Sequence, residues 1–137
     1  MSTNAERVRR WYKEVWVPGG EATVHELMAE TLEGYMEGSD VSTRAQFLAE
    51  RARLLGAFPD LAIVADDVIA EGDKVAVRWH VNATHKGNDL GFQATNLRVA
   101  FRGMTWLEFK DGRIVRGWDN WNLGGLLQTL TAGAAAV

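Results

Sequence analysis

The sequence contains no cysteine in its 137 residues. This absence excludes disulfides, thiolate metal sites and cysteine nucleophiles. No stretch approaches the roughly 20 apolar residues of a membrane span, and the first ten residues, MSTNAERVRR, hold no apolar core of the signal-peptide kind. We therefore expect a cytoplasmic protein with no membrane partner, because a reducing compartment is the default for a chain without disulfides.

The sequence also lacks a run of like charges, and its net charge is −3. This balance gives no reason to expect a nucleic-acid partner. No glycine-rich phosphate loop, His-x-x-x-His or Gly-x-Ser-x-Gly motif is found. The histidines His25, His80 and His85 have no carboxylate pattern around them, so we expect no metal and no cofactor.

Helical patterns occupy the first part of the chain. Thr3-x-x-Glu6 is a capping box before an apolar stripe that includes Trp11 and Tyr12, and Pro18 ends this helix. A short helix follows and ends near Glu30, and 32–36 is a brief strand. A second capping box, Thr43-x-x-Gln46, begins a third helix that stops before 58–60.

After Pro59 the apolar period changes to two, which indicates strands. The predicted strands are 61–70, 75–83, 94–109 and 113–121, with a bulge at Gly103, a hairpin turn at Asp111-Gly112, and Asn122 as the cap of a last, leucine-rich helix. The pattern predicts one α+β domain over 1–137, with 131–137 disordered. Its strongly curved antiparallel sheet and three N-terminal helices should form a cone that encloses a pocket, with a short C-terminal helix.

Asp119 is the candidate catalytic residue. It shares a strand face with Trp121, and the facing strand places Thr105, Leu107 and Phe109 on one largely apolar face. A carboxyl among these groups should be partly desolvated, which raises its pKa and suits a general acid or base. Alternatively, Trp118 points inward and Asp119 is solvated.

The remaining candidates are substrate-binding residues: Thr105, Trp121, Phe109, Tyr35, His85 and Trp79. We expect His85 either to be solvated in its loop or to close over the pocket mouth, and Tyr35 to bind a ligand oxygen or to be a core ring. His80 should lie on the outer face of the sheet. The six tryptophans suit either a tightly packed core or a pocket for a small apolar molecule.

The face opposite Asp119 carries Met104, Trp106, Ile114 and Trp118. A monomer seldom exposes a large apolar patch. We therefore expect a homodimer through the outer face of the sheet.

An ordered set of motifs resembles the SnoaL-like polyketide cyclase family. The motifs are 58–60, 70–79, 84–87, 101–103, 111–115, Trp118-Asp119 and 125–127. The resemblance implies the cone fold of nuclear transport factor and ketosteroid isomerase, often as an oligomer, with Asp119 as an acid/base that closes a polyketide ring by aldol condensation without cofactor or metal. The chain departs from the family at Thr105, where a histidine is expected, and at Asn96, where a glycine is usual.

Three functions therefore remain open at the level of sequence. The first is a cofactor-independent enzyme of the lyase or isomerase class that acts on a hydrophobic carbonyl compound. The others are a non-catalytic binder of an apolar ligand and a hydroxylase or hydrolase of the same family. An open cavity at Asp119 would favour an enzyme, and a filled cone would favour the binder.

Overall fold

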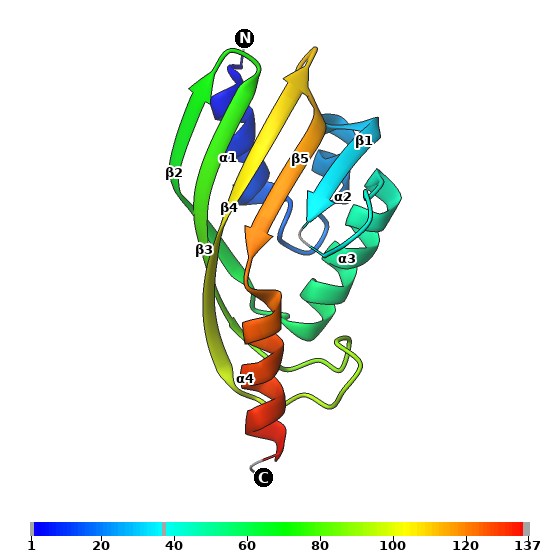
Figure 1. Cartoon of the computed structure of the whole chain (residues 1–137), viewed down its shortest axis with the longest axis vertical. Helices are drawn as coiled ribbons and strands as arrows, with labels where there is room; N and C mark the ends of the chain where they lie inside the picture. The colour runs from blue at the N-terminus through cyan, green and yellow to red at the C-terminus, as the bar shows by residue number, and fades with distance from the viewer. Residues whose placement is uncertain (1, 37, 136–137) are drawn as a thin grey trace.

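Helices and strands follow the chain in the order that the sequence patterns predict. The computed structural model describes residues 2–36 and 38–135. Its elements are α1 (Asn4–Glu14), α2 (Glu21–Leu27), β1 (Met28–Met36), α3 (Arg44–Ala57), β2 (Ala62–Glu71), β3 (Lys74–Thr84), β4 (Arg98–Lys110), β5 (Arg113–Trp121) and α4 (Leu123–Ala135). The long strands β3 and β4 are curved, and α4 continues beyond the end of β5 (Figure 1).

Capping side chains set the starts of two helices. The Thr3 hydroxyl accepts a hydrogen bond from the Glu6 amide at the start of α1. At α3 both halves of the capping box between Thr43 and Gln46 are formed. These bonds satisfy first-turn amides that have no partner within the helix. The second helix is shorter than predicted, because the chain becomes extended at Met28.

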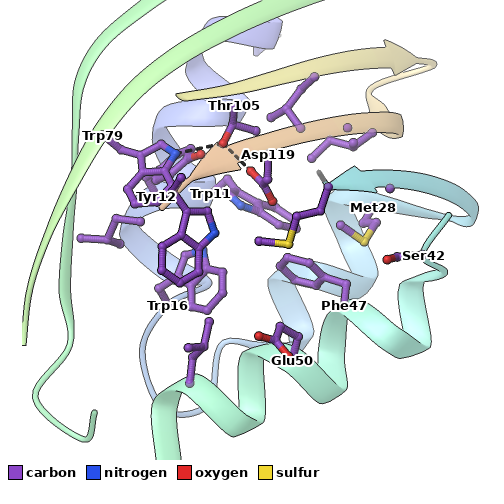
Figure 2. Close-up of a pocket in the computed structure, with 18 of the residues that line it drawn as sticks. Trp11, Tyr12, Trp16, Met28, Ser42, Phe47, Glu50, Trp79, Thr105 and Asp119 are labelled. Carbon is purple, nitrogen blue, oxygen red and sulfur yellow. Dashed lines mark hydrogen bonds between the residues drawn. The ribbon is translucent and has the colours of Figure 1, made fainter. Parts of the chain in front are cut away.

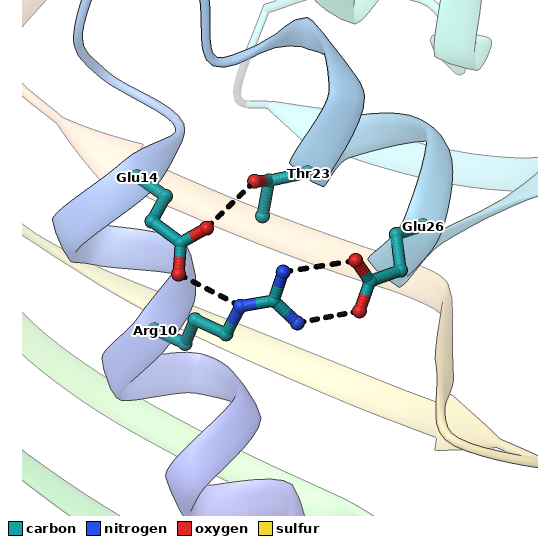
Figure 3. A network of polar contacts seen from close by, with 4 residues as sticks. All are labelled: Arg10, Glu14, Thr23 and Glu26. Atoms are coloured by element: carbon teal, nitrogen blue, oxygen red, sulfur yellow. Dashed lines mark hydrogen bonds and ion pairs between the residues drawn. The ribbon is translucent and has the colours of Figure 1, made fainter.

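A cluster of polar side chains joins α1 to α2 (Figure 3). Arg10 pairs with Glu14 on its own helix, at 2.7 Å, and with both carboxylate oxygens of Glu26 on α2. The Thr23 hydroxyl donates to Glu14 at 2.9 Å. These ion pairs are solvent-exposed, so they orient α2 against α1 more than they stabilise the fold.

The five described strands form one sheet in the order β1-β5-β4-β3-β2. Strands β2 to β5 are antiparallel, as predicted, but β1 pairs with β5 in parallel. The expectation of a wholly antiparallel sheet was therefore wrong for this edge. Side-chain alternation does not encode strand direction, and β1 reaches the edge from a part of the chain distant in sequence.

A tight hairpin and a bulge connect β4 to β5. Asp111 and Gly112 both have positive φ, 52° and 77°, as a two-residue type I′ turn requires. Glu108 pairs with Arg116 while Phe109 pairs with Ile114, so the bulge lies in β5, and the bulge predicted at Gly103 was wrong. The bulge also turns Ile114 inward, where it is 1% exposed, which corrects its predicted place on the outer face.

The outer face of the sheet carries one apolar row across all five described strands. The row is formed by register partners: Ile69, Ala76, Trp106, Trp118 and Tyr35. Ile69 is 68% exposed and Trp106 is 44% exposed. Tyr35 and Trp118 stack with their ring centroids 5.0 Å apart. Trp118 therefore lies on the face opposite Asp119.

Helix α4 begins at the predicted cap and extends further than expected. The Asn122 side-chain oxygen accepts a hydrogen bond from the Gly125 amide, and Leu126 and Leu130 are buried. The helix continues to Ala135, so the expectation of disorder was wrong for 131–135, and 136–137 lie outside the described residues. Alanine has the highest helix propensity, which accounts for this extension. Within the described residues, no helix is long and apolar enough to cross a bilayer.

Candidate active site

Thr105 on β4 and Asp119 on β5 are register partners. The β5 bulge sets this register, because without it the two-residue turn would pair Thr105 with Trp118. The Thr105 hydroxyl donates to Oδ1 of Asp119 at 2.5 Å, and the Trp79 indole nitrogen donates to the Thr105 oxygen at 2.9 Å (Figure 2). The side-chain alternation of two paired strands therefore places the carboxyl and the hydroxyl on the inner face of the sheet. The alternative in which Trp118 points inward is excluded.

The inner face borders an apolar cavity of about 160 Å³, counted as the space open to the centre of a water molecule. Its walls come from both the helices and the sheet. The aromatic wall residues are Trp11, Tyr12, Trp16, Tyr35, Phe47, Trp79, Phe101 and Trp121. Trp11 and Phe47 lie 5.5 Å apart between centroids, and Phe101 and Trp121 stack at 4.9 Å. Flat aromatic walls of this kind favour a flat, apolar ligand.

The cavity lining carries carboxyl groups and no cationic side chain. Figure 2 shows Asp119 on the sheet wall and Glu50 on the helical wall. Arg53 holds Glu50 through two hydrogen bonds, at 3.0 and 2.7 Å. Among the described residues that line the cavity, none is Lys, Arg or His. The charge of this lining therefore favours a neutral ligand over an anionic one.

Burial raises the pKa of Asp119, and the hydrogen bond from Thr105 opposes part of that rise. The residue is half-buried, and the surface it leaves accessible borders the cavity. Burial also raises the pKa of Tyr12, with a further contribution from the charge of Asp119, so its hydroxyl stays protonated at neutral pH. A carboxyl with a raised pKa can both accept and return a proton near neutral pH.

The structure places five of the seven predicted site residues along the cavity and separates Phe109 and His85 from it. Trp79 and Trp121 line the cavity with Asp119 and Thr105. Tyr35 borders the cavity, but its ring stacks on Trp118 and its hydroxyl donates to Glu33 at 2.8 Å, so that hydroxyl does not face a ligand.

Phe109 is buried in the core and is not part of the cavity lining, which corrects its prediction as a substrate-binding residue. Phe109 is on the inner face of β4 with Thr105 and Leu107, as the strand alternation predicts, but it packs into the filled core near the hairpin end of the strand. As expected, His80 lies on the outer face, where it pairs with Asp66 at 2.8 Å.

His85 is neither solvated nor at the cavity mouth, so both expectations for it were wrong. It is fully buried, its Nδ1 accepts a hydrogen bond from the Thr95 amide at 3.1 Å, and its ring packs against Phe58 and Phe92. Desolvation lowers its pKa. Asn96, which follows Thr95, has a φ of 60°, which is the left-handed conformation. Glycine, the residue expected here from the family resemblance, adopts this conformation without strain.

Many cavity residues were not predicted, and they come from the helices, the strands and the loops. Trp11 and Tyr12 belong to the apolar stripe of α1, Trp16 follows its end, and Phe47 and Glu50 lie one turn apart on α3. The stripe was visible as a buried helix face, but its pattern does not say which residues border empty space. Within residues 2–36 and 38–135, no group of three His, Asp or Glu side chains could hold a metal ion.

Comparisons with known proteins agree with this fold. A SnoaL-like polyketide cyclase from Jannaschia sp. CCS1, a proposed assignment, has a TM-score of 0.86 at 24% identity, with 94% of this chain and 92% of that chain covered. IdmH of Streptomyces antibioticus, a proposed polyketide cyclase, has a TM-score of 0.81 at 22% identity, with 98% of this chain and 99% of that chain covered. A search of the curated proteins found no significant match.

AclR of Streptomyces galilaeus, a proposed hydroxylase, is 30% identical over 95% of this chain and 83% of its own, with a TM-score of 0.82. The family model for the SnoaL-like polyketide cyclase matches residues 6–130. This match covers nearly the whole chain, including all the residues that line the cavity. The chain belongs to the SnoaL-like polyketide cyclase family.

Proposed function

We propose that this chain is an enzyme of the lyase or isomerase class in which Asp119 is the general acid and base. Its substrate is a neutral, hydrophobic carbonyl compound of the polyketide type. One observation carries the proposal: a desolvated carboxyl, held on one oxygen by Thr105, borders a cavity walled by aromatic rings. An open cavity at this carboxyl favours catalysis over a purely structural core.

The proposed reaction begins with removal of a proton from a carbon flanked by carbonyl groups. The C–H electron pair moves into an enolate, and the proton passes to the Asp119 carboxylate. In ring closure, the enolate carbon forms a bond to a second carbonyl carbon of the same molecule, and the alkoxide oxygen takes the proton from Asp119. In isomerisation, the carboxyl returns the proton to a different carbon.

The aromatic walls contribute by holding the substrate in a reactive conformation. A flexible polyketide has many conformations, and only a few bring the two reacting carbons together. Tyr12 supplies a protonated hydroxyl in the same wall, which suits hydrogen bonding to the enolate oxygen. The carboxyl groups of the lining disfavour an anionic substrate.

Proton abstraction can be tested directly with ethyl benzoylacetate, a neutral aryl β-keto ester. Deuterium incorporation at its α-carbon is followed by NMR in D₂O, against the rate without protein. We expect Asp119→Asn to lower the protein-dependent rate by about 10² or more, while Asp66→Asn on the outer face leaves it unchanged. Equal rates for the Asp119 variant and the wild type would refute the assignment of Asp119.

A hydroxylase is a second candidate, favoured by the 30% identity to AclR. Hydroxylation needs an oxidant such as O₂, whereas the proposed proton transfer does not. Oxygen consumption that depends on this protein and on an aromatic substrate would favour the hydroxylase. Deuterium exchange under anaerobic conditions would favour the acid/base enzyme.

A further inference from the structure

A chain of two hydrogen bonds crosses three neighbouring strands and ends at the carboxyl. Trp79 on β3 donates to Thr105 on β4, and Thr105 donates to Asp119 on β5. The direction of each bond follows from chemistry. An indole nitrogen can only donate, and a threonine hydroxyl has a single hydrogen. The Thr105 hydrogen points to Oδ1 of Asp119, while the Trp79 N–H occupies a lone pair of the same hydroxyl oxygen.

Gly103 provides the room that this arrangement needs. It pairs with Trp79 on one side and Trp121 on the other, midway between them on β4. A Cβ atom at this position would lie 2.5 Å from the Trp79 ring and 2.8 Å from the Trp121 Cβ. The Trp79 ring therefore lies over the backbone of β4, where its nitrogen reaches Thr105. Any side chain at Gly103 would have to displace it.

The two carboxylate oxygens of Asp119 consequently have different environments. Oδ1 receives the Thr105 hydroxyl. Within residues 2–36 and 38–135, the hydrogen bond found at this carboxyl goes to Oδ1, and Asp119 borders the cavity. The other titratable groups of the cavity wall are Tyr12 on α1, Tyr35 on β1 and Glu50 on α3. Of these, Tyr12 interacts with the charge of Asp119 and with the Thr105 side chain.

We propose that Trp79 is a positioning residue, which directs the Thr105 hydroxyl onto Oδ1 of Asp119 and so leaves Oδ2 as the oxygen that exchanges a proton with substrate. The absence of a side chain at Gly103 leaves the room that the Trp79 ring needs for this contact. This inference rests on the proposed acid/base role of Asp119. In the usual family pattern the residue beside the aspartate is a histidine, so here an indole and a hydroxyl together supply the donor.

The test is a ¹³C NMR titration of the Asp119 carboxyl carbon, which needs no substrate. Thr105→Val should raise its pKa by about 1–2 units, the effect of losing one hydrogen bond to a charged group. Thr105→Ser keeps the hydroxyl and should return the pKa to the wild-type value. Trp79→Phe should raise it by about 0.3 unit or more, because the neighbouring bond polarises the hydroxyl. Gly103→Ala should shift it in the same direction.

Trp121→Phe is the matched control, since it also removes an indole from the cavity wall but leaves the hydrogen-bond chain intact. Loss of ring volume alone admits water and lowers the pKa of a buried carboxyl, so this variant should show no rise. A folded Trp79→Phe protein whose Asp119 pKa is unchanged or lower would overturn the proposal.

A measurement on the wild-type protein covers the case in which these variants do not fold. The Trp79 indole proton should exchange slowly with solvent, and its chemical shift should follow the titration of Asp119 and lose that dependence in Asp119→Asn. Fast exchange or no titration would overturn the proposal. The proposed function can fail independently of this inference. If Asp119→Asn exchanges deuterium at the wild-type rate while Trp79→Phe raises the pKa of Asp119, the hydrogen-bond chain is supported and the acid/base role of Asp119 is refuted.

Discussion

Replacing Arg51 with methionine tests how the helical wall of the cavity is held in place. Arg51 on α3 is 2% exposed, and its guanidinium donates to the carbonyls of Val15 and Val17, each at 2.5 Å. It also pairs with Glu21 at 3.0 Å. The two carbonyls flank Trp16, which lines the cavity. One buried side chain therefore fixes the end of α1 and the position of a wall residue.

The expected loss of stability follows from these contacts. Each hydrogen bond from the charged donor to a carbonyl contributes about 1.5–3 kcal/mol. The pair with the exposed Glu21 contributes about 0–1 kcal/mol. Methionine removes the cost of burying a charge, which offsets part of the sum. We expect a net loss of about 2–4 kcal/mol, a large share of the roughly 5–15 kcal/mol that stabilises a typical domain.

Urea denaturation followed by tryptophan fluorescence measures this loss. The control is Arg53→Met, two residues along the same helix. Arg53 forms an ion pair with Glu50, and the two side chains are 37% and 40% exposed. We expect this control to lose less than about 1 kcal/mol. If Arg51→Met were as stable as Arg53→Met, the buried guanidinium would not be what holds the end of α1.

Three further predictions follow from the site and the sheet. Burial raises the pKa of Asp119 in the folded state above its pKa in the unfolded state. The protonated carboxyl therefore stabilises the fold fully below the unfolded-state pKa, and this contribution is lost as the pH rises through the folded-state pKa. Asp119→Asn should therefore melt at a higher temperature than wild type at pH 7, with the difference vanishing in acid; a lower melting temperature at pH 7 would contradict this. The pH–rate profile of the wild type should show one carboxyl-like ionisation, shifted upward, and Thr105→His should add a second; a histidine ionisation already present in the wild type would contradict the assignment. We also propose a homodimer through the outer sheet face, which Trp106→Asp should weaken in sedimentation velocity; a wild-type monomer at micromolar concentration would refute it.

Much of the sheet and the central part of the site could be predicted from the sequence. A strand of period two has only two faces, so Asp119 had to share a face with Trp121, and Thr105 with Leu107. The Asp111-Gly112 turn marked where the two strands meet, because only small or flexible residues tolerate positive φ at both turn positions. The capping boxes marked helix starts for a similarly local reason. Each of these features depends on residues a few positions apart.

What only the tertiary structure decided depends on contacts between distant segments. The parallel pairing of β1 with β5, the burial of His85 and the outward ring of Tyr35 each result from elements that meet only after folding. The β5 bulge brought Asp119 opposite Thr105 and turned Ile114 inward, since one extra residue exchanges the faces of a strand beyond it. The sequence by itself narrowed the inward residue of β5 to Asp119 or Trp118, and the register with β4 placed Asp119 inside. The packing of α1 and α3 against the sheet decided that it faces an aromatic cavity, because the space between side chains is set by all the surrounding elements together.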